Sequence, residues 1–138
     1  MQTILYNCSL IDGLNKDIKE NAYLIIEDKK IVEVGTGKVE QTESANLVDV
    51  KGKFVMPGLI DCHVHLVWDG TEDPQKKIEH LDESKVALQA YSHALLTIKE
   101  GITTVRDVAS PGKSVLNLRD VINSGSLIGP TIVASGPA

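Results

Sequence analysis

Three polar side chains, Asp61, His63 and His65, stand at every second position of an otherwise apolar run over residues 59–68. Side chains of a β-strand alternate between its two faces, so a strand here places all three on one face. Burying two imidazoles and a carboxylate costs free energy unless they have partners. A divalent metal ion is such a partner, because two neutral imidazoles at this spacing can direct ring nitrogens at one ion. The spacing predicts a metal site at His63 and His65, with Asp61 accepting a hydrogen bond from an imidazole or a nearby backbone amide.

A His-x-His pair by itself is also typical of histidines that only make ordinary hydrogen bonds. The surroundings of this pair favour the metal site, since Pro57-Gly58 introduces the run and a regular alternation of strands and helices follows it. The opposite face of the strand is apolar, and we expect it to pack under a helix. That face consists of Ile60, Cys62, Val64 and Leu66.

From residue 57 onward the sequence predicts the order β-α-β-α-β, with strands over 59–68, 102–106 and 131–134 and helices over 84–100 and 115–123. In the first helix, an apolar stripe recurs at helical spacing, Ser84 is positioned to cap the start, and Gly101 follows the end. The stripe comprises Leu88, Tyr91, Leu95 and Ile98. Residues 69–74 read as a loop. This order favours a parallel sheet with right-handed crossovers.

The first 56 residues show a different pattern, with five short strands over 4–11, 22–26, 31–34, 47–50 and 54–56 and no helix. The second and third strands are joined by residues 27–30, which indicates a hairpin. Its turn lacks the glycine that tight hairpin turns prefer. The sequence thus predicts a β-rich subdomain over 1–56 and an α/β portion over 57–138.

Composition excludes several classes of protein. The chain has 138 residues, 42% of them hydrophobic, and a formal net charge of −5, which argues against intrinsic disorder. A pI near 5.3 argues against a nucleic-acid partner. No apolar run reaches the ~18 residues of a membrane span, and the N-terminus lacks a signal-peptide pattern, so we expect no membrane partner and a cytoplasmic location. Cys8 and Cys62 lie far apart in apolar runs and are expected to be small buried hydrophobes.

Residues 57–66, Pro-Gly-Leu-Ile-Asp-Cys-His-Val-His-Leu, resemble the first barrel strand of the amidohydrolase superfamily of metal-dependent hydrolases. Gly-Ile-Thr-Thr-Val-Arg-Asp over 101–107 and the segment 125–136 are similar to the imidazolonepropionase-like and prolidase-like branch. The resemblance implies an α/β fold, in which 57–138 are the first three strands and two helices of a (β/α)₈ TIM barrel and 1–56 a small β-sandwich-like subdomain. One departure is Lys29 in the hairpin, where many relatives carry glycine.

By this resemblance, His63 and His65 are ligands of the more buried of one or two divalent ions, with zinc favoured by an imidazole-rich site. The activity implied is hydrolysis of a small amide, cyclic amide or dipeptide C–N bond by metal-activated water. The remaining ligands and the catalytic base are expected beyond Ala138. The resemblance therefore predicts an N-terminal portion that is inactive alone. Such a portion needs the remainder of the barrel or a homo-oligomer partner for a closed fold.

Other residues carry weaker signals. Trp68 would stand at the mouth of a substrate pocket or be an ordinary rim residue. Asp107 would orient substrate or a ligand histidine, or else pair with Arg106 or cap a turn. His80 and His93 fall in helical stretches and are expected to be surface or packing residues. Two alternatives stay open: a non-catalytic α/β metal-binding or assembly module, and a nucleotide-binding domain, against which the missing glycine-rich fingerprint argues.

Overall fold

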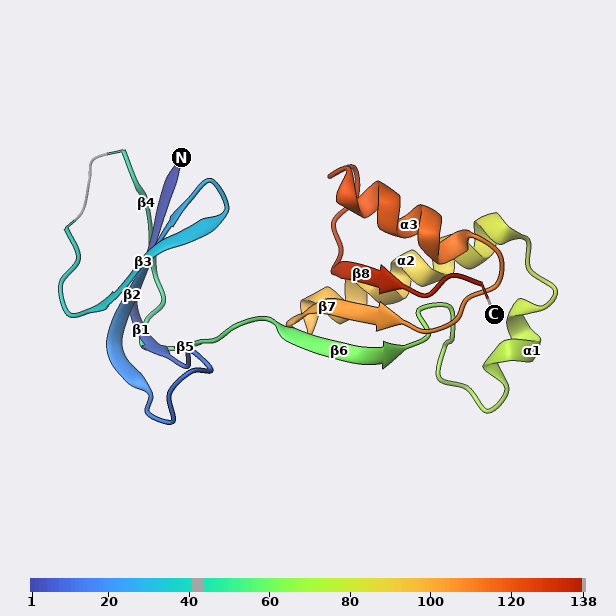
Figure 1. Cartoon of the computed structure of the whole chain (residues 1–138), viewed down its shortest axis with the longest axis horizontal. Helices are drawn as coiled ribbons and strands as arrows, with labels where there is room; N and C mark the ends of the chain where they lie inside the picture. The colour runs from blue at the N-terminus through green and yellow to red at the C-terminus, as the bar shows by residue number, and fades with distance from the viewer. Residues whose placement is uncertain (41–43, 138) are drawn as a thin grey trace. The chain divides into compact units, whose positions relative to one another are not determined.

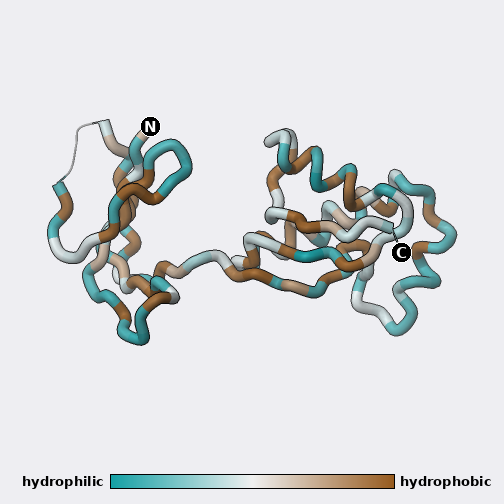
Figure 2. Tube along the Cα trace, in the orientation of Figure 1, coloured by the Kyte–Doolittle hydropathy of each residue, from teal (hydrophilic) through white to brown (hydrophobic). Residues whose placement is uncertain are grey.

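The computed structural model describes residues 1–40 and 44–137. They form two compact units, Met1–Pro57 and Gly58–Ala138 (Figure 1). Hydrophobic residues follow the strands of both units, whereas α1 and the loops beside it are largely hydrophilic (Figure 2). Among the described residues, no helix combines the length and apolar character needed to cross a membrane.

The first unit is a five-stranded mixed sheet. Its strands are β1 (Gln2–Leu10), β2 (Lys19–Glu27), β3 (Lys30–Thr36), β4 (Asn46–Asp49) and β5 (Phe54–Val55). The order is β3-β2-β1-β4, and β5 also pairs with β1. The prediction of five strands, including the β2–β3 hairpin, is confirmed. A small buried cluster of Cys8, Leu10, Ala22 and Leu24 supports this sheet, and Cys8 is buried as expected.

The hairpin between β2 and β3 turns without glycine. Asp28 and Lys29 have φ of 46° and 69°, the left-handed values that a two-residue type I′ turn requires at both positions. Side chains other than glycine adopt this region at a cost, because Cβ approaches the neighbouring carbonyl oxygen. The lysine at position 29 therefore leaves the turn strained.

We expect Lys29→Gly to stabilise the first unit by about 0.5–1 kcal/mol. Glycine removes the steric cost of the left-handed conformation, but it loses more backbone entropy on folding, which offsets part of the gain. The midpoint of urea-induced unfolding measures the change. Lys30→Gly is the matched control, because Lys30 begins β3 opposite Glu27 and has no positive φ. That control should lower the midpoint, and an equal loss in both variants would show that the turn is not strained.

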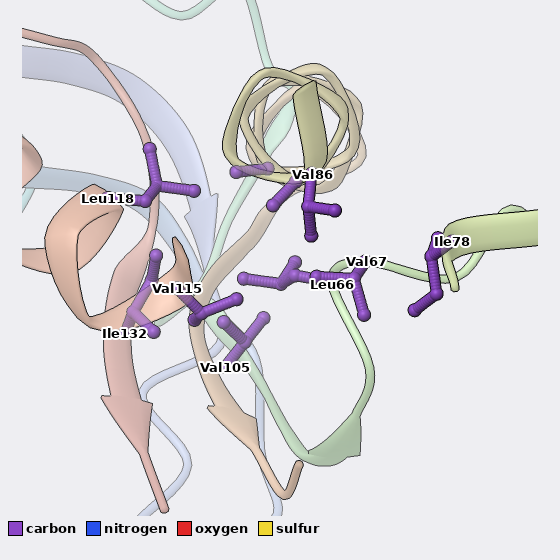
Figure 3. Packing of buried hydrophobic residues seen from close by; sticks show 10 residues of the cluster. Leu66, Val67, Ile78, Val86, Val105, Val115, Leu118 and Ile132 are labelled. Carbon is purple, nitrogen blue, oxygen red and sulfur yellow. The ribbon is translucent and has the colours of Figure 1, made fainter. Parts of the chain in front are cut away.

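The second unit contains a parallel three-stranded sheet in the order β6-β7-β8. Its elements are β6 (Leu59–Val64), α1 (Pro74–Ile78), α2 (Glu83–Lys99), β7 (Ile102–Asp107), α3 (Ser114–Asn123) and β8 (Thr131–Ala134). Parallel pairing of all three strands confirms that prediction. The buried side chains of the helices, of β7 and β8 and of the segment after β6 converge on one core (Figure 3). That core includes Leu66, Val67, Val86, Val105, Val115, Leu118 and Ile132.

β6 differs from the predicted strand in length and in burial. It ends at Val64, so His65 and Trp68 lie beyond it. Its register against β7 shifts twice, which interrupts the expected alternation. Val64 and Leu66 pack in or against the core, but Ile60 is 67% exposed and Cys62 is also exposed. The prediction that these two are covered by a helix is wrong, because the helices lie against β7 and β8 while β6 is an edge strand.

Helix α2 begins at a different cap from the predicted one. Asp82, not Ser84, is the N-cap residue, and its carboxylate accepts the backbone N–H of Lys85 at 2.9 Å. Ser84 instead donates its hydroxyl to Asp82 at 2.5 Å. These bonds, with Ser84 contributing most, lower the pKa of Asp82 to about 2. The carboxylate therefore stays ionised at neutral pH, where its negative charge interacts favourably with the positive end of the helix dipole.

The buried face of α2 is narrower than the predicted stripe. Val86, Ala90 and Ala94 are its buried residues, whereas Leu88 is 68% exposed. These three residues belong to the core of the second unit, and Tyr91 of the predicted stripe packs against that core. Gly101 follows the helix with φ of 83°, as expected for a residue just past a helix end.

Helix α1 is a short helix that the sequence pattern does not predict. Pro74 begins it, and the side chain of Asp73 caps it by accepting the N–H of Lys76 at 3.2 Å. His80 lies in the exposed turn that follows α1 and not in a helix. Its expected surface position is confirmed, but its helical placement is wrong.

Candidate metal centre

The two imidazoles of the predicted site lie together at the C-terminal end of β6. The ring centroids of His63 and His65 are 5.6 Å apart, with their planes at 75°. Two imidazoles that bind one ion through nitrogens at about 2.1 Å, at a tetrahedral angle, have centroids about 5.3 Å apart. The spacing of the two rings therefore fits a shared ion.

His65 is held in a defined tautomer. Its Nδ1 lies 3.2 Å from the carbonyl oxygen of Ala109, and a carbonyl can only accept, so Nδ1 carries the hydrogen. The lone pair is then on Nε2. Histidine ligands in metal sites commonly have their second nitrogen fixed in this way, so the chemistry of this donor fits a divalent cation.

Asp61 takes one of the two roles left open by the sequence. Its carboxylate accepts the backbone N–H of His63 at 3.0 Å, so it anchors the main chain beside the first imidazole. The half-buried Asp61 side chain thus contacts the peptide group, not the imidazole ring.

Trp68 lies against the second imidazole. The indole stacks on His65 with a centroid distance of 3.7 Å and an interplanar angle of 26°. Trp68 also borders a cavity of about 360 Å³ whose remaining walls come from α1, the turn after it, the start of α2 and the loop after β7. The lining residues are Trp68, Gln75, Ile78, Glu79, Leu81, Glu83, Val86, Ala109, Ser110, Pro111 and Gly112. A molecule in this cavity would lie beside Trp68, the residue whose ring stacks on His65.

Asp107, the last residue of β7, is fully buried. One carboxylate oxygen, Oδ2, accepts the backbone N–H of Leu66 at 2.8 Å, while Oδ1 has no hydrogen-bond partner among the described residues. Burial raises the pKa of this carboxyl, and the Leu66 N–H and the nearby His65 partly oppose that rise. The sequence also allowed a pair with Arg106, but no such ion pair occurs in the described part of the chain. The partner of Asp107 is instead the residue that follows His65.

Two residues of α2 that the sequence did not connect with this site also contact the segment after β6. Nδ1 of His93 lies 2.8 Å from the carbonyl oxygen of Leu66, and the side-chain amide of Gln89 donates to the carbonyl of Val67 at 2.8 Å. His93 is thus a half-buried packing residue, and it contacts the residue that follows His65. The sequence feature that could have identified them is the i, i+4 spacing of these two polar side chains, next to the buried alanines of the helix.

The described residues hold no group of three or more histidine, cysteine, aspartate or glutamate side chains arranged to bind one metal ion. A tetrahedral zinc site needs three or four ligands. His63 and His65 alone would supply only part of such a ligand set.

Comparison with known proteins identifies the family. Residues 54–138 match the Amidohydrolase family, and the chain belongs to it. An imidazolonepropionase of Fusobacterium nucleatum is 48% identical over 59 residues, which are 41% of this chain and 14% of that protein. A 5-methylthioadenosine/S-adenosylhomocysteine deaminase of Bacillus cereus is 29% identical over 127 residues, or 80% of this chain and 29% of that protein.

Solved structures agree. A Xaa-Pro dipeptidase with methionine bound in its active site superposes with a TM-score of 0.90 at 33% identity, over 100% of this chain and 34% of that one. A prolidase complexed with N-methylphosphonate-L-proline gives a TM-score of 0.87 at 28% identity, over 100% of this chain and 32% of that one. The predicted relationship to imidazolonepropionase-like and prolidase-like enzymes is confirmed. The chain spans about a third or less of the length of these relatives.

Proposed function

We propose that this chain contributes the first two metal ligands, His63 and His65, to a metal-dependent amidohydrolase that hydrolyses C–N bonds of small molecules. The observation that carries the proposal is the pair of rings 5.6 Å apart at the C-terminal end of a parallel strand. Barrel enzymes place their active sites at this end of their strands. In this proposal, residues 57–138 are the first three strands and two main helices of a (β/α)₈ barrel, and residues 1–56 form the small β subdomain.

In this proposal each residue of the site has a separate role. A divalent ion bound here, for which imidazole ligands favour zinc, would lower the pKa of its water and polarise the scissile bond. His63 and His65 would hold the ion through ring nitrogens, and the carbonyl of Ala109 accepts a hydrogen bond from Nδ1 of His65. Trp68 excludes water from one side of the second imidazole and faces the substrate from the wall of the cavity. We assign the catalytic base to no residue of this chain.

The proposed substrate is a small amide, cyclic amide or dipeptide, in line with the imidazolonepropionase and dipeptidase relatives. A second candidate reaction is deamination, because the deaminase relative aligns with 80% of this chain. Both reactions use an activated water to attack a carbon bonded to nitrogen. Family membership does not favour the non-catalytic metal-binding or assembly module. The cytoplasmic location and the number of ions stay predictions.

A chimera tests the reaction type. The chain replaces the corresponding segment of the similar dipeptidase, so that the rest of the barrel is supplied, and the product is loaded with zinc. We expect proline release from Xaa-Pro dipeptides or ring opening of a cyclic amide. Ammonia release from an adenosine-type substrate would instead favour deamination. A folded, zinc-loaded chimera that turns over none of the three substrates would contradict the hydrolase proposal, with the unaltered dipeptidase as the positive control.

A further inference from the structure

Residues 65–68 form a tight turn directly after β6, closed by the backbone N–H of Trp68 donating to the carbonyl of His65 at 3.0 Å. We call this segment the 65–68 turn. The imidazole of His65 and the indole of Trp68 stand at its two ends and stack on one another. The conformation of the turn therefore sets how both rings are presented.

Side chains from two other elements satisfy the peptide groups inside the turn. Asp107 of β7 accepts the N–H of Leu66 at 2.8 Å. His93 of α2 lies 2.8 Å from the carbonyl of Leu66, so its Nδ1 is the protonated nitrogen. Gln89, one helical turn earlier, donates to the carbonyl of Val67 at 2.8 Å. Buried peptide groups need such partners, and here all three partners are polar side chains.

The apolar side chains of the turn are buried as well. Leu66 and Val67 are 3% and 0% exposed and belong to the core of the second unit (Figure 3). The turn is thus held by its side chains in the core and by its peptide groups at Asp107, His93 and Gln89. These contacts therefore fix the backbone from which the His65 and Trp68 side chains extend.

Asp107 would be energetically costly if its only role were to pack in the core. Asp107 is fully buried and leaves one carboxylate oxygen without a partner in the described structure, an arrangement that an apolar side chain of similar size would avoid. A role limited to filling the core does not account for a carboxylate at this position. Acceptance of the Leu66 N–H accounts for it.

We propose that Asp107, His93 and Gln89 are positioning residues that fix the 65–68 turn and so aim the His65 imidazole at its ion. The metal part of this inference rests on the proposed function. The positioning part concerns the turn itself and can be tested without metal.

Three readouts on the 138-residue chain test the proposal: hydrogen exchange of the Leu66 amide, emission of Trp68, which is the only tryptophan, and affinity for Zn²⁺. Asp107→Ala and His93→Phe each remove one anchor. We expect at least about tenfold faster exchange at Leu66, a red shift of the emission, and about 10- to 100-fold weaker zinc binding. Asp107→Asn keeps an acceptor and should recover most of each effect.

Val105→Ala is the control, because Val105 is fully buried in the same strand but makes no polar contact with the turn. It should lower the urea midpoint while leaving Trp68 emission and zinc affinity unchanged. If Val105→Ala matches Asp107→Ala in these two readouts, the anchors are merely structural and the proposal is overturned. Should Asp107→Ala fail to fold, Gln89→Met at a half-buried helix position decides the same question.

The outcomes separate the two proposals. An unaltered chain that does not bind Zn²⁺, with anchor variants that still loosen Leu66 and shift Trp68, would remove the metal function and keep the positioning role. An unaltered chain that binds Zn²⁺, with anchor variants that leave all three readouts unchanged, would remove the positioning role and keep the metal function.

Discussion

The double variant His63→Asn, His65→Asn is expected to bind Zn²⁺ more than about 100-fold more weakly than the unaltered chain. Loss of a residue that only supports a metal ligand already costs about 10- to 100-fold in affinity, and here both proposed ligands are removed. Asparagine keeps a polar side chain of moderate size at each position, so the fold should survive. Competition with a chromophoric zinc chelator measures the affinity, and the absorption spectrum of the Co²⁺ complex reports imidazole coordination.

His80→Asn is the control for this experiment, since His80 is exposed in the turn after α1 and takes no part in the site. It should bind Zn²⁺ as the unaltered chain does. Each single variant, at His63 or at His65, should lose most of the affinity, because an ion bound by one imidazole is held weakly. If the double variant keeps its zinc while His80→Asn loses it, the ion binds at the wrong place for the proposed site.

The features that the sequence predicted well are those carried by local pattern. Short β-branched runs gave the five strands of the first unit, and alternating strands and helices gave the parallel sheet of the second. The helix over 114–123 and the strand over 131–134 differ from their predicted bounds by one residue or none. The pairing of His63 with His65 needed only a spacing of two residues, and the structure brings their rings together.

The features that the sequence missed depend on contacts between distant segments. Asp107 contacts a residue 41 positions away, and His93 one 27 positions away, so no window of local pattern contains both partners. β6 ends at Val64, and the turn that follows contains Leu66, the residue that both side chains contact. Local hydrophobicity also placed Leu88 in the buried stripe of α2, although Leu88 is 68% exposed and the buried residues of the helix are Val86, Ala90 and Ala94.

The exposure of Ile60 and Cys62 on β6 also depends on which distant segments pack together. Ile60 and Cys62 are apolar residues in a strand that pairs on one edge only, and the helices of the unit lie against β7 and β8. An apolar edge strand left uncovered is a liability that proteins normally cover or pair. The proposed barrel supplies such cover, which is why an edge strand with this composition is consistent with the family.

The 138-residue chain alone is expected to turn over neither Xaa-Pro dipeptides nor cyclic amides, even with Zn²⁺ present. The reason is chemical: two imidazoles hold an ion loosely, and the described residues contain no larger group of metal-binding side chains. In the dipeptidase chimera, by contrast, the other ligands are supplied. There His65→Asn should lower kcat/KM by more than about 1,000-fold, because the loss falls on a group that acts as a unit with the other ligands.

Steady-state assays of the isolated chain, the chimera and its His65→Asn variant decide this prediction together. His80→Asn in the chimera is the matched control and should leave kcat/KM within about twofold, since exposed positions outside the site contribute little. Turnover by the isolated chain that disappears with His65→Asn would show that two imidazoles suffice, and would overturn the expectation of inactivity while supporting the site. Full activity of the His65→Asn chimera would remove His65 from the ligand set. In that case the turn, the stacked Trp68 and the Asp107 anchor would serve the fold alone.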